Sequence, residues 1–153
     1  MIDTATWYIF LQLLVAVVLG GLIGVEREYK GKPAGVKTYA LVCLGSALFI
    51  ILGQHFLFGG ELARESLDPS RVLSAVVMGV GFLGGGLIIK KEGEVEGLTT
   101  AAGLWIAAAI GATIGVGLFL VAIFTTALTI FIFQSIVVLE NKYIRKNKEK
   151  DNN

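Results

Sequence analysis

The chain has 153 residues, of which 55% are hydrophobic, 16% are charged and 20 are glycine. This composition excludes an ordinary soluble domain and a disordered chain, both of which carry more charge. The net charge of +1 argues against a nucleic-acid-binding domain, and the single cysteine excludes an internal disulfide. The charged residues gather in short clusters between long apolar stretches, which is typical of a membrane protein.

Five membrane-spanning helices are predicted. Three charge-free stretches each match one helix across a bilayer core about 30 Å thick, because a helix rises about 1.5 Å per residue. A fourth stretch, 97–139, is about twice too long for one span and contains Gly115-Val116-Gly117, where a turn is expected. The predicted spans are residues 4–25, 38–60, 72–89, 99–114 and 118–139, followed by a basic tail at 140–153.

The placement of Lys and Arg predicts the orientation of these spans. With the N-terminus outside, eleven of the 13 Lys and Arg residues fall on the inner side, and only Arg64 and Arg71 fall on the outer side. Cations in short loops gather on the cytoplasmic side. The prediction is therefore an all-α, polytopic membrane bundle with its N-terminus outside and its C-terminus cytoplasmic. Aromatic residues that fit the interfacial belts are Trp7 and Tyr8 outside and Tyr29, Tyr39 and Tyr143 inside.

Small residues at four-residue spacing predict close helix packing, because lipid gives helices no hydrophobic reason to associate. The third span is rich in glycine, and two interpretations of it remain open. Its glycines either pack against a neighbouring helix, or residues 84–86 unwind and expose carbonyls to an ion. The glycines concerned are Gly20 and Gly24 in the first span, Gly79, Gly81, Gly84, Gly85 and Gly86 in the third, and Gly103 and Gly111 in the fourth.

An internal repeat is a further hypothesis. The segment that begins Gly31-(three residues)-Gly35 after the first span resembles the one that begins Gly93-(three residues)-Gly97 after the third, at an offset of 62. Two helical hairpins related by an axis normal to the bilayer would explain this similarity. Chance similarity between glycine-rich apolar sequences is the alternative.

The charged residues lie at or beyond the ends of the predicted spans, which weakens a pump-like interpretation. Glu26 and Glu28 point to different faces of a helix, so one is expected to face the bundle and pair with Lys37 while the other is solvated. Asp68 and Arg71 fit a helix start with an ion pair, or a functional group at the outer mouth.

Other reactive residues have plain structural interpretations. Cys43 is expected to pack in the interior and His55 to lie at the outer interface. The acidic loop of Glu92, Glu94 and Glu96 favours a solvated hairpin, although Mg²⁺ can be held by one or two carboxylates and water. The sequence has no second His or Cys with which to build a nucleophile pair, so no enzyme activity is expected.

Several blocks together resemble the membrane domain of the MgtC/SapB family. The family implies a multi-pass protein of the bacterial plasma membrane, linked to growth under magnesium limitation and, in some pathogens, to survival in macrophages. The resemblance carries over Glu26, Arg27, Lys37, Asp68, Arg71 and the glycines of the third span, without assigned roles. The matching blocks are Gly24-Val25-Glu26-Arg27-Glu28, Gly31-Lys32-Pro33-Ala34-Gly35-Val36-Lys37-Thr38, Leu44-Gly45-Ser46-Ala47, Asp68-Pro69-Ser70-Arg71, Gly79-Val80-Gly81-Phe82-Leu83-Gly84-Gly85-Gly86 and Gly97-Leu98-Thr99-Thr100-Ala101-Ala102.

Some positions depart from the family pattern. Lys37 and Tyr39 stand where Arg and His are common, and Gly85 stands where Ala is common. The soluble C-terminal domain of longer members is not part of this sequence, so regulation through that domain is not expected.

Two principal functions follow from the resemblance. The first is a non-enzymatic regulator that contacts another membrane complex, for which the family implies the ATP synthase. The second is a small transporter or channel for Mg²⁺ or another ion, which would need a homodimer to enclose a path. A scaffold that only oligomerises is a third, weaker interpretation. A continuous polar route from Asp68 and Arg71 to Glu26 would favour transport.

Overall fold

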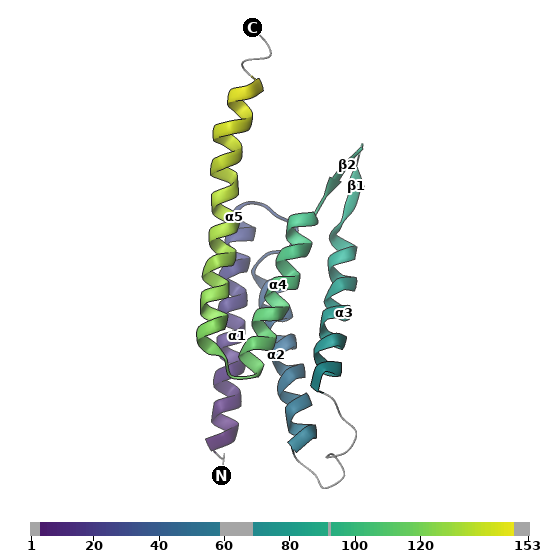
Figure 1. Cartoon of the computed structure of the whole chain (residues 1–153), viewed down its shortest axis with the longest axis vertical. Helices are drawn as coiled ribbons and strands as arrows, with labels where there is room; N and C mark the ends of the chain where they lie inside the picture. Colours follow the sequence, from purple (N-terminus) through teal and green to yellow (C-terminus); the bar gives the residue numbers. More distant parts are fainter. Residues whose placement is uncertain (1–3, 59–68, 92, 149–153) are drawn as a thin grey trace.

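The computed structural model describes residues 4–58, 69–91 and 93–148 of the chain. These residues form helices joined by short connections, with one two-stranded hairpin (Figure 1). The predicted helical bundle is confirmed, and the small hairpin is its only β-structure within the described ranges. In chain order the elements are α1 (Thr4–Tyr29), α2 (Val36–Phe58), α3 (Pro69–Leu87), β1 (Ile89–Lys91), β2 (Glu94–Glu96), α4 (Leu98–Gly115) and α5 (Phe119–Lys148).

Helices α1 to α4 are each long and apolar enough to cross a membrane. Helix α5 has a shorter apolar part, Phe119–Ser135, and then continues without a break to Lys148. The last predicted span and much of the basic tail therefore form one helix. The turn expected at 115–117 is present, since α4 ends at Gly115 and Gly117 adopts a left-handed φ of 85°.

Helix α4 is the centre of the bundle and contacts all four other helices. Helices α1 and α2 form one hairpin, α3 and α4 form another, and α5 packs against α1 and α4. The hairpin β1–β2 projects beyond α3 and α4 at the end of the molecule toward which α5 extends, whereas the N-terminus lies at the opposite end (Figure 1). By the predicted orientation, the end with the hairpin is the inner end.

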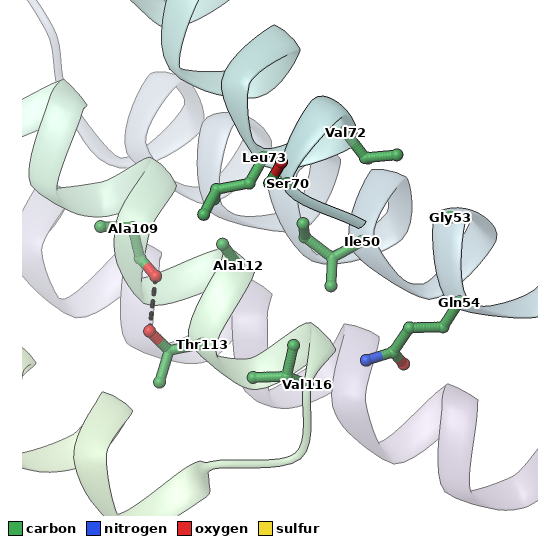
Figure 2. Close-up of a pocket in the computed structure, with 10 residues that line it drawn as sticks. All are labelled: Ile50, Gly53, Gln54, Ser70, Val72, Leu73, Ala109, Ala112, Thr113 and Val116. Carbon is green, nitrogen blue, oxygen red and sulfur yellow. Dashed lines mark hydrogen bonds between the residues drawn. The ribbon is translucent and has the colours of Figure 1, made fainter. Parts of the chain in front are cut away.

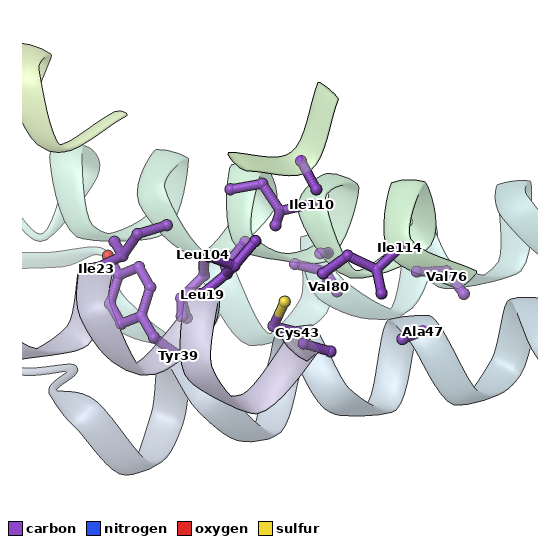
Figure 3. Packing of buried hydrophobic residues seen from close by; sticks show 14 of the residues in the cluster. Leu19, Ile23, Tyr39, Cys43, Ala47, Val76, Val80, Leu104, Ile110 and Ile114 are labelled. Atoms are coloured by element: carbon purple, nitrogen blue, oxygen red, sulfur yellow. The ribbon is translucent and has the colours of Figure 1, made fainter. Parts of the chain in front are cut away.

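Glycines let the backbones of α1, α2 and α4 approach closely around Cys43, which is fully buried (Figure 3). A Cβ added at Gly20 would lie 2.7 Å from the Cβ of Cys43, and one added at Gly111 would collide with the Cys43 carbonyl. Gly24 approaches Val36 in the same way, with an added Cβ 2.5 Å from its Cα. The small-residue faces of the first and fourth spans thus lie at helix contacts.

The glycines of α3 behave differently. An added Cβ at Gly84 would make an ordinary contact of 3.5 Å with Ala101, but one at Gly79, Gly81, Gly85 or Gly86 would meet nothing within 4 Å. Residues 84–86 remain helical up to Leu87, so the unwound interpretation of this segment is wrong. Three glycines in sequence are tolerated here because the helix ends directly after them.

The proposed repeat has local counterparts in the two connections. Gly31 and Gly93 both have left-handed φ values, 63° and 94°. The carbonyl of Gly35 accepts the N–H of Tyr39 at 3.1 Å, and the carbonyl of Gly97 accepts that of Ala101 at 2.9 Å. The connections differ in that only the second forms strands, with Ile89 opposite Glu96. A superposition of the two hairpins stays a prediction.

Replacing Gly111 with leucine is expected to lower stability by about 3 kcal/mol or more, because a side chain there must displace the backbone of α2 at Cys43. The matched control is Gly85→Leu, which adds the same side chain in open space and should leave stability unchanged or slightly higher. Thermal unfolding of the purified protein in detergent measures both. Equal melting temperatures for the two variants would contradict this account of the core.

Candidate functional site

A charged cluster is buried at the inner end of α1. Glu26 and Arg27 are only 9% and 3% exposed, although such residues are rarely buried without partners. They lie in the last turn of α1, where α2, α4 and α5 all pack against this helix. We name Glu26, Arg27, Lys30, Tyr39, Thr100 and Phe133 the inner cluster, because contacts join these six side chains or their backbone.

Glu26 forms its ion pairs within its own helix. One carboxylate oxygen lies 2.5 Å from Nζ of Lys30, and the other lies 3.6 Å from a guanidinium nitrogen of Arg27. The predicted pairing with Lys37 is wrong, since Lys37 is exposed. Lys30 is the partner because it follows Glu26 by four residues, which places both side chains on one helix face.

Arg27 joins α1 to two other helices. Its guanidinium donates to the hydroxyl of Thr100 at 3.4 Å and lies 4.3 Å from the centre of the Phe133 ring. The second contact has cation–π geometry. Tyr39 adds α2, because its hydroxyl donates to the carbonyl of Thr100 at 3.3 Å. One buried arginine and its neighbours thereby fix α1, α2, α4 and α5 relative to one another.

Tyr39 itself corrects a prediction. It is fully buried, with 0% exposure, and does not lie in an interfacial aromatic belt. Its ring fits beside Gly103, where a Cβ would collide with the Tyr39 hydroxyl. The absence of a side chain on α4 thus creates the space that a large side chain from α2 fills.

The inner cluster does not fit a resident metal ion. It holds one carboxylate and two cations, and the described residues contain no group of three His, Cys, Asp or Glu that could hold a metal. At about 4 Å and an effective dielectric constant of about 20, a divalent ion and one guanidinium repel each other by about 8 kcal/mol. Beyond these ion pairs, the oxygens of Glu26 and Nε of Arg27 make no further hydrogen bond within the described residues.

Glu28 lies on the opposite side of the helix end and has a structural role. It is exposed, and one of its oxygens accepts the N–H of Val36, the first residue of α2, at 2.9 Å. The carboxylate thereby accepts a hydrogen bond from an amide that has no partner within α2. Its negative charge also interacts favourably with the positive N-terminal end of the α2 helix dipole. The prediction that Glu26 and Glu28 point in different directions is confirmed.

The remaining candidate residues do not join the inner cluster. Arg71 and His55 are exposed in α3 and α2, and Cys43 is buried among apolar neighbours. Glu94 and Glu96 are exposed on β2, in agreement with a solvated hairpin. Asp68 and Glu92 lie outside the described residues.

Four further residues with polar or cation–π contacts were not predicted from the sequence, namely Gln12, Lys30, Thr100 and Phe133. Gln12 is buried in α1, and its amide donates to the carbonyls of Ile114 and Gly115 at 2.8 and 3.0 Å. It therefore supplies hydrogen bonds to carbonyls at the C-terminal end of α4 that have no partner within the helix. A single amide within an apolar span was the available signal, because an unpaired polar group is costly in hydrocarbon.

A cavity of about 430 Å³ lies between α2, α3 and α4 toward the outer end (Figure 2). Its polar lining includes Gln54 and Thr113, but the Thr113 hydroxyl donates to the carbonyl of Ala109 in its own helix at 2.7 Å. The inner cluster contributes no residue to this lining. Between the two lie buried apolar side chains, among them Cys43, Ala47, Leu104 and Ile110 (Figure 3).

Comparisons with known proteins identify relatives. The model of the MgtC family matches residues 13–142. A protein of Escherichia coli named "Putative magnesium transporter YhiD" is 39% identical over 138 residues, which cover 90% of this chain and 64% of that protein. Protein MgtC of Salmonella typhimurium is 38% identical over 138 residues, covering 90% of this chain and 55% of MgtC. Protein SrpB of Synechococcus elongatus is 43% identical over 131 residues, covering 78% of this chain and 71% of SrpB.

The chain spans less than two thirds of the length of the Escherichia coli and Salmonella relatives. No solved structure matches the chain significantly. These comparisons bear on the membrane domain that the relatives share with this chain.

Removal of the Glu26 carboxylate is expected to cost about 3 kcal/mol, because Glu26→Ala leaves two cations in a poorly solvated site. Glu28→Ala is the matched control two residues away and should cost only about 1 kcal/mol through loss of a cap. Thermal unfolding in detergent compares the two.

The double variant Glu26→Ala with Lys30→Met should recover part of the loss, since it removes one of the unpaired cations. Equal losses for Glu26→Ala and Glu28→Ala, or no recovery in the double variant, would contradict the assigned burial of this ion pair.

Proposed function

Because the chain belongs to the MgtC family, we propose that it is a non-enzymatic membrane regulator in adaptation to magnesium limitation that acts through contacts with another membrane complex. The observation that carries this proposal is the close-packed apolar interior between the outer cavity and the inner cluster. A transporter needs a polar or hydrated route through this region. The described residues offer packed side chains there instead.

The glycine contacts support a rigid interior. At Gly20 and Gly111 the neighbouring backbones lie so close that no side chain fits. Opening a path for a hydrated ion along α4 would separate these contacts, which supply the van der Waals packing that holds helices together in lipid. A fixed bundle suits a protein that presents a surface to a partner.

The charges at the inner end also favour a regulatory function rather than cation transport. A Mg²⁺ ion that reaches Glu26 must displace Lys30 and approach Arg27. The inner cluster carries one negative and two positive charges, so its net field opposes a cation. Buried in this way, Glu26 balances the charge of Arg27 and Lys30, which contact α4 and α5.

The surface available for a partner includes the basic connection between α1 and α2. Lys32 and Lys37 are exposed there, and Tyr29 is 92% exposed at the end of α1. Cations in this position lie near the inner membrane surface, where they attract acidic groups of a partner or of lipid. The ATP synthase is the first complex to test, because the family resemblance implies it.

Transport of Mg²⁺ or another ion is the second candidate. The printed name of the Escherichia coli relative favours it, and that protein shares 39% identity with this chain. Such a mechanism requires either a rearranged bundle or a path formed with further subunits.

Flux measurements in proteoliposomes separate the two candidates. Folded wild-type protein, Glu26→Gln and an empty-vesicle control are compared across Mg²⁺ gradients, with and without a membrane potential. We expect the wild-type protein to give no flux above empty vesicles. Saturable flux that Glu26→Gln abolishes would overturn the regulatory proposal and place the ion path at the inner cluster.

Reversal of the charge at Lys37 is expected to abolish support of growth at limiting Mg²⁺ while leaving stability within about 0.5 kcal/mol, because this side chain is exposed. Lys90→Glu on β1 is a control of equal charge change at another exposed inner position. Growth of cells lacking the endogenous protein and carrying each variant provides the readout, with membrane levels measured in parallel. Full growth with Lys37→Glu would exclude this surface as the functional contact.

A further inference from the structure

An apolar groove runs along one side of the bundle between α2 and α3. It has a volume of about 600 Å³. Its lining includes the small residues Gly45, Ala75 and Gly79, together with the large side chains of Phe49 and Phe82. The residues that line it carry no charge. Small residues that expose backbone in this way allow another helix to approach closely.

The glycines in this groove contact no partner helix among the residues that the structure describes. Elsewhere in the bundle, Gly20, Gly24 and Gly111 lie where an added Cβ would collide with a neighbour. At Gly45 and Gly79 an added Cβ would meet nothing within 4 Å. Glycine within a helix costs about 1 kcal/mol relative to alanine, and close packing is what offsets this cost in membranes. Helix α3 is also sparsely covered, with 17% of its apolar window buried against 56% in α4.

The side of the bundle that corresponds to this groove, formed by α1 and α4, is covered by α5. The two hairpins make equivalent contacts: α2 and α4 meet at the centre, α1 contacts α4, and α3 contacts α2. Helix α5 packs against α1 and α4. Exchanging the two hairpins would move α5 to a position against α3 and α2, which is the side on which the groove lies.

From these three observations we propose that the α2–α3 groove is the interface with a second copy of this chain. Copies of one chain insert in the same orientation, so a two-fold axis along the membrane normal brings residues together at equal depth. Gly45 and Gly79 lie at similar depths, about 14 Å and about 12 Å from the inner ends of α2 and α3. Gly45 of one copy can therefore lie beside Gly79 of the other.

Large side chains on the same face make the contact self-complementary. Phe82 is 82% exposed and Phe49 is 58% exposed, and both line the groove. The face therefore carries both small residues that leave space and large ones that lack packing partners in the monomer. In the dimer, the large side chains of one copy fill the space beside the small residues of the other copy. No unpaired charge is buried in the contact. This dimer is compatible with either candidate function.

Cysteine cross-linking in native membranes tests the proposal. In a Cys43→Ala background, Phe82→Cys lies at the groove, and Phe131→Cys on α5 is the control, with 65% exposure and an inner-half position. We expect a bifunctional thiol reagent to give an adduct of twice the chain mass with Phe82→Cys, about tenfold more than with Phe131→Cys, because the dimer raises the local thiol concentration.

A second pair of variants distinguishes the interface from the fold. Gly79→Leu, added to the Phe82→Cys chain, should abolish the adduct by filling the groove, whereas Gly85→Leu on the same helix should retain it. A Cβ added at either position meets no atom within 4 Å in the monomer, so unchanged thermal unfolding is expected for both. Equal adduct yields from Phe82→Cys and Phe131→Cys would overturn the proposal. An adduct with a protein of another mass would overturn it as well and assign the groove to a different partner.

Discussion

The contact of α4 with Cys43 of α2, made through Gly111, sets the arrangement of the other helices. Helices in a membrane gain little from exchanging lipid for one another unless their surfaces fit closely. A glycine at this position removes the side chain that would hold the two backbones apart. With α2 and α4 fixed at this distance, α1 fits against both through Gly20, while α3 and α5 occupy the two sides of α4.

The same close approach explains why the inner cluster is buried. Tyr39 can insert beside α4 only because position 103 lacks a side chain. The Tyr39 hydroxyl then bonds the backbone of Thr100, whose side chain receives Arg27. Lys30 extends the connection to α5 by donating to the carbonyl of Phe133 at 2.7 Å. The polar contacts at the inner end therefore depend on glycine contacts deeper in the bundle.

Much of this fold could be predicted from the sequence because charge-free length is a direct measure of a membrane span. The turn before Leu118 was also accessible, since paired glycines mark it. The partner of Glu26 was predicted incorrectly, although the four-residue spacing to Lys30 within one helix was present in the sequence. The roles of Thr100 and Phe133 could not be predicted from the sequence, for another reason. Both depend on α4 and α5 meeting a helix end more than 70 residues earlier in the chain.

The bond from Gln12 to the end of α4 has a consequence for the depth of the α4–α5 turn in the membrane. Gln12 bonds the last carbonyls of α4, and one turn above it Tyr8 packs against Phe119 at the start of α5, with ring centres 6.0 Å apart. These two contacts hold the α4–α5 turn at the depth of Tyr8, which is predicted to lie at the outer membrane interface. The non-helical backbone of this turn is therefore expected to lie at the level of the lipid headgroups, where water can pair with it, and not in the hydrocarbon.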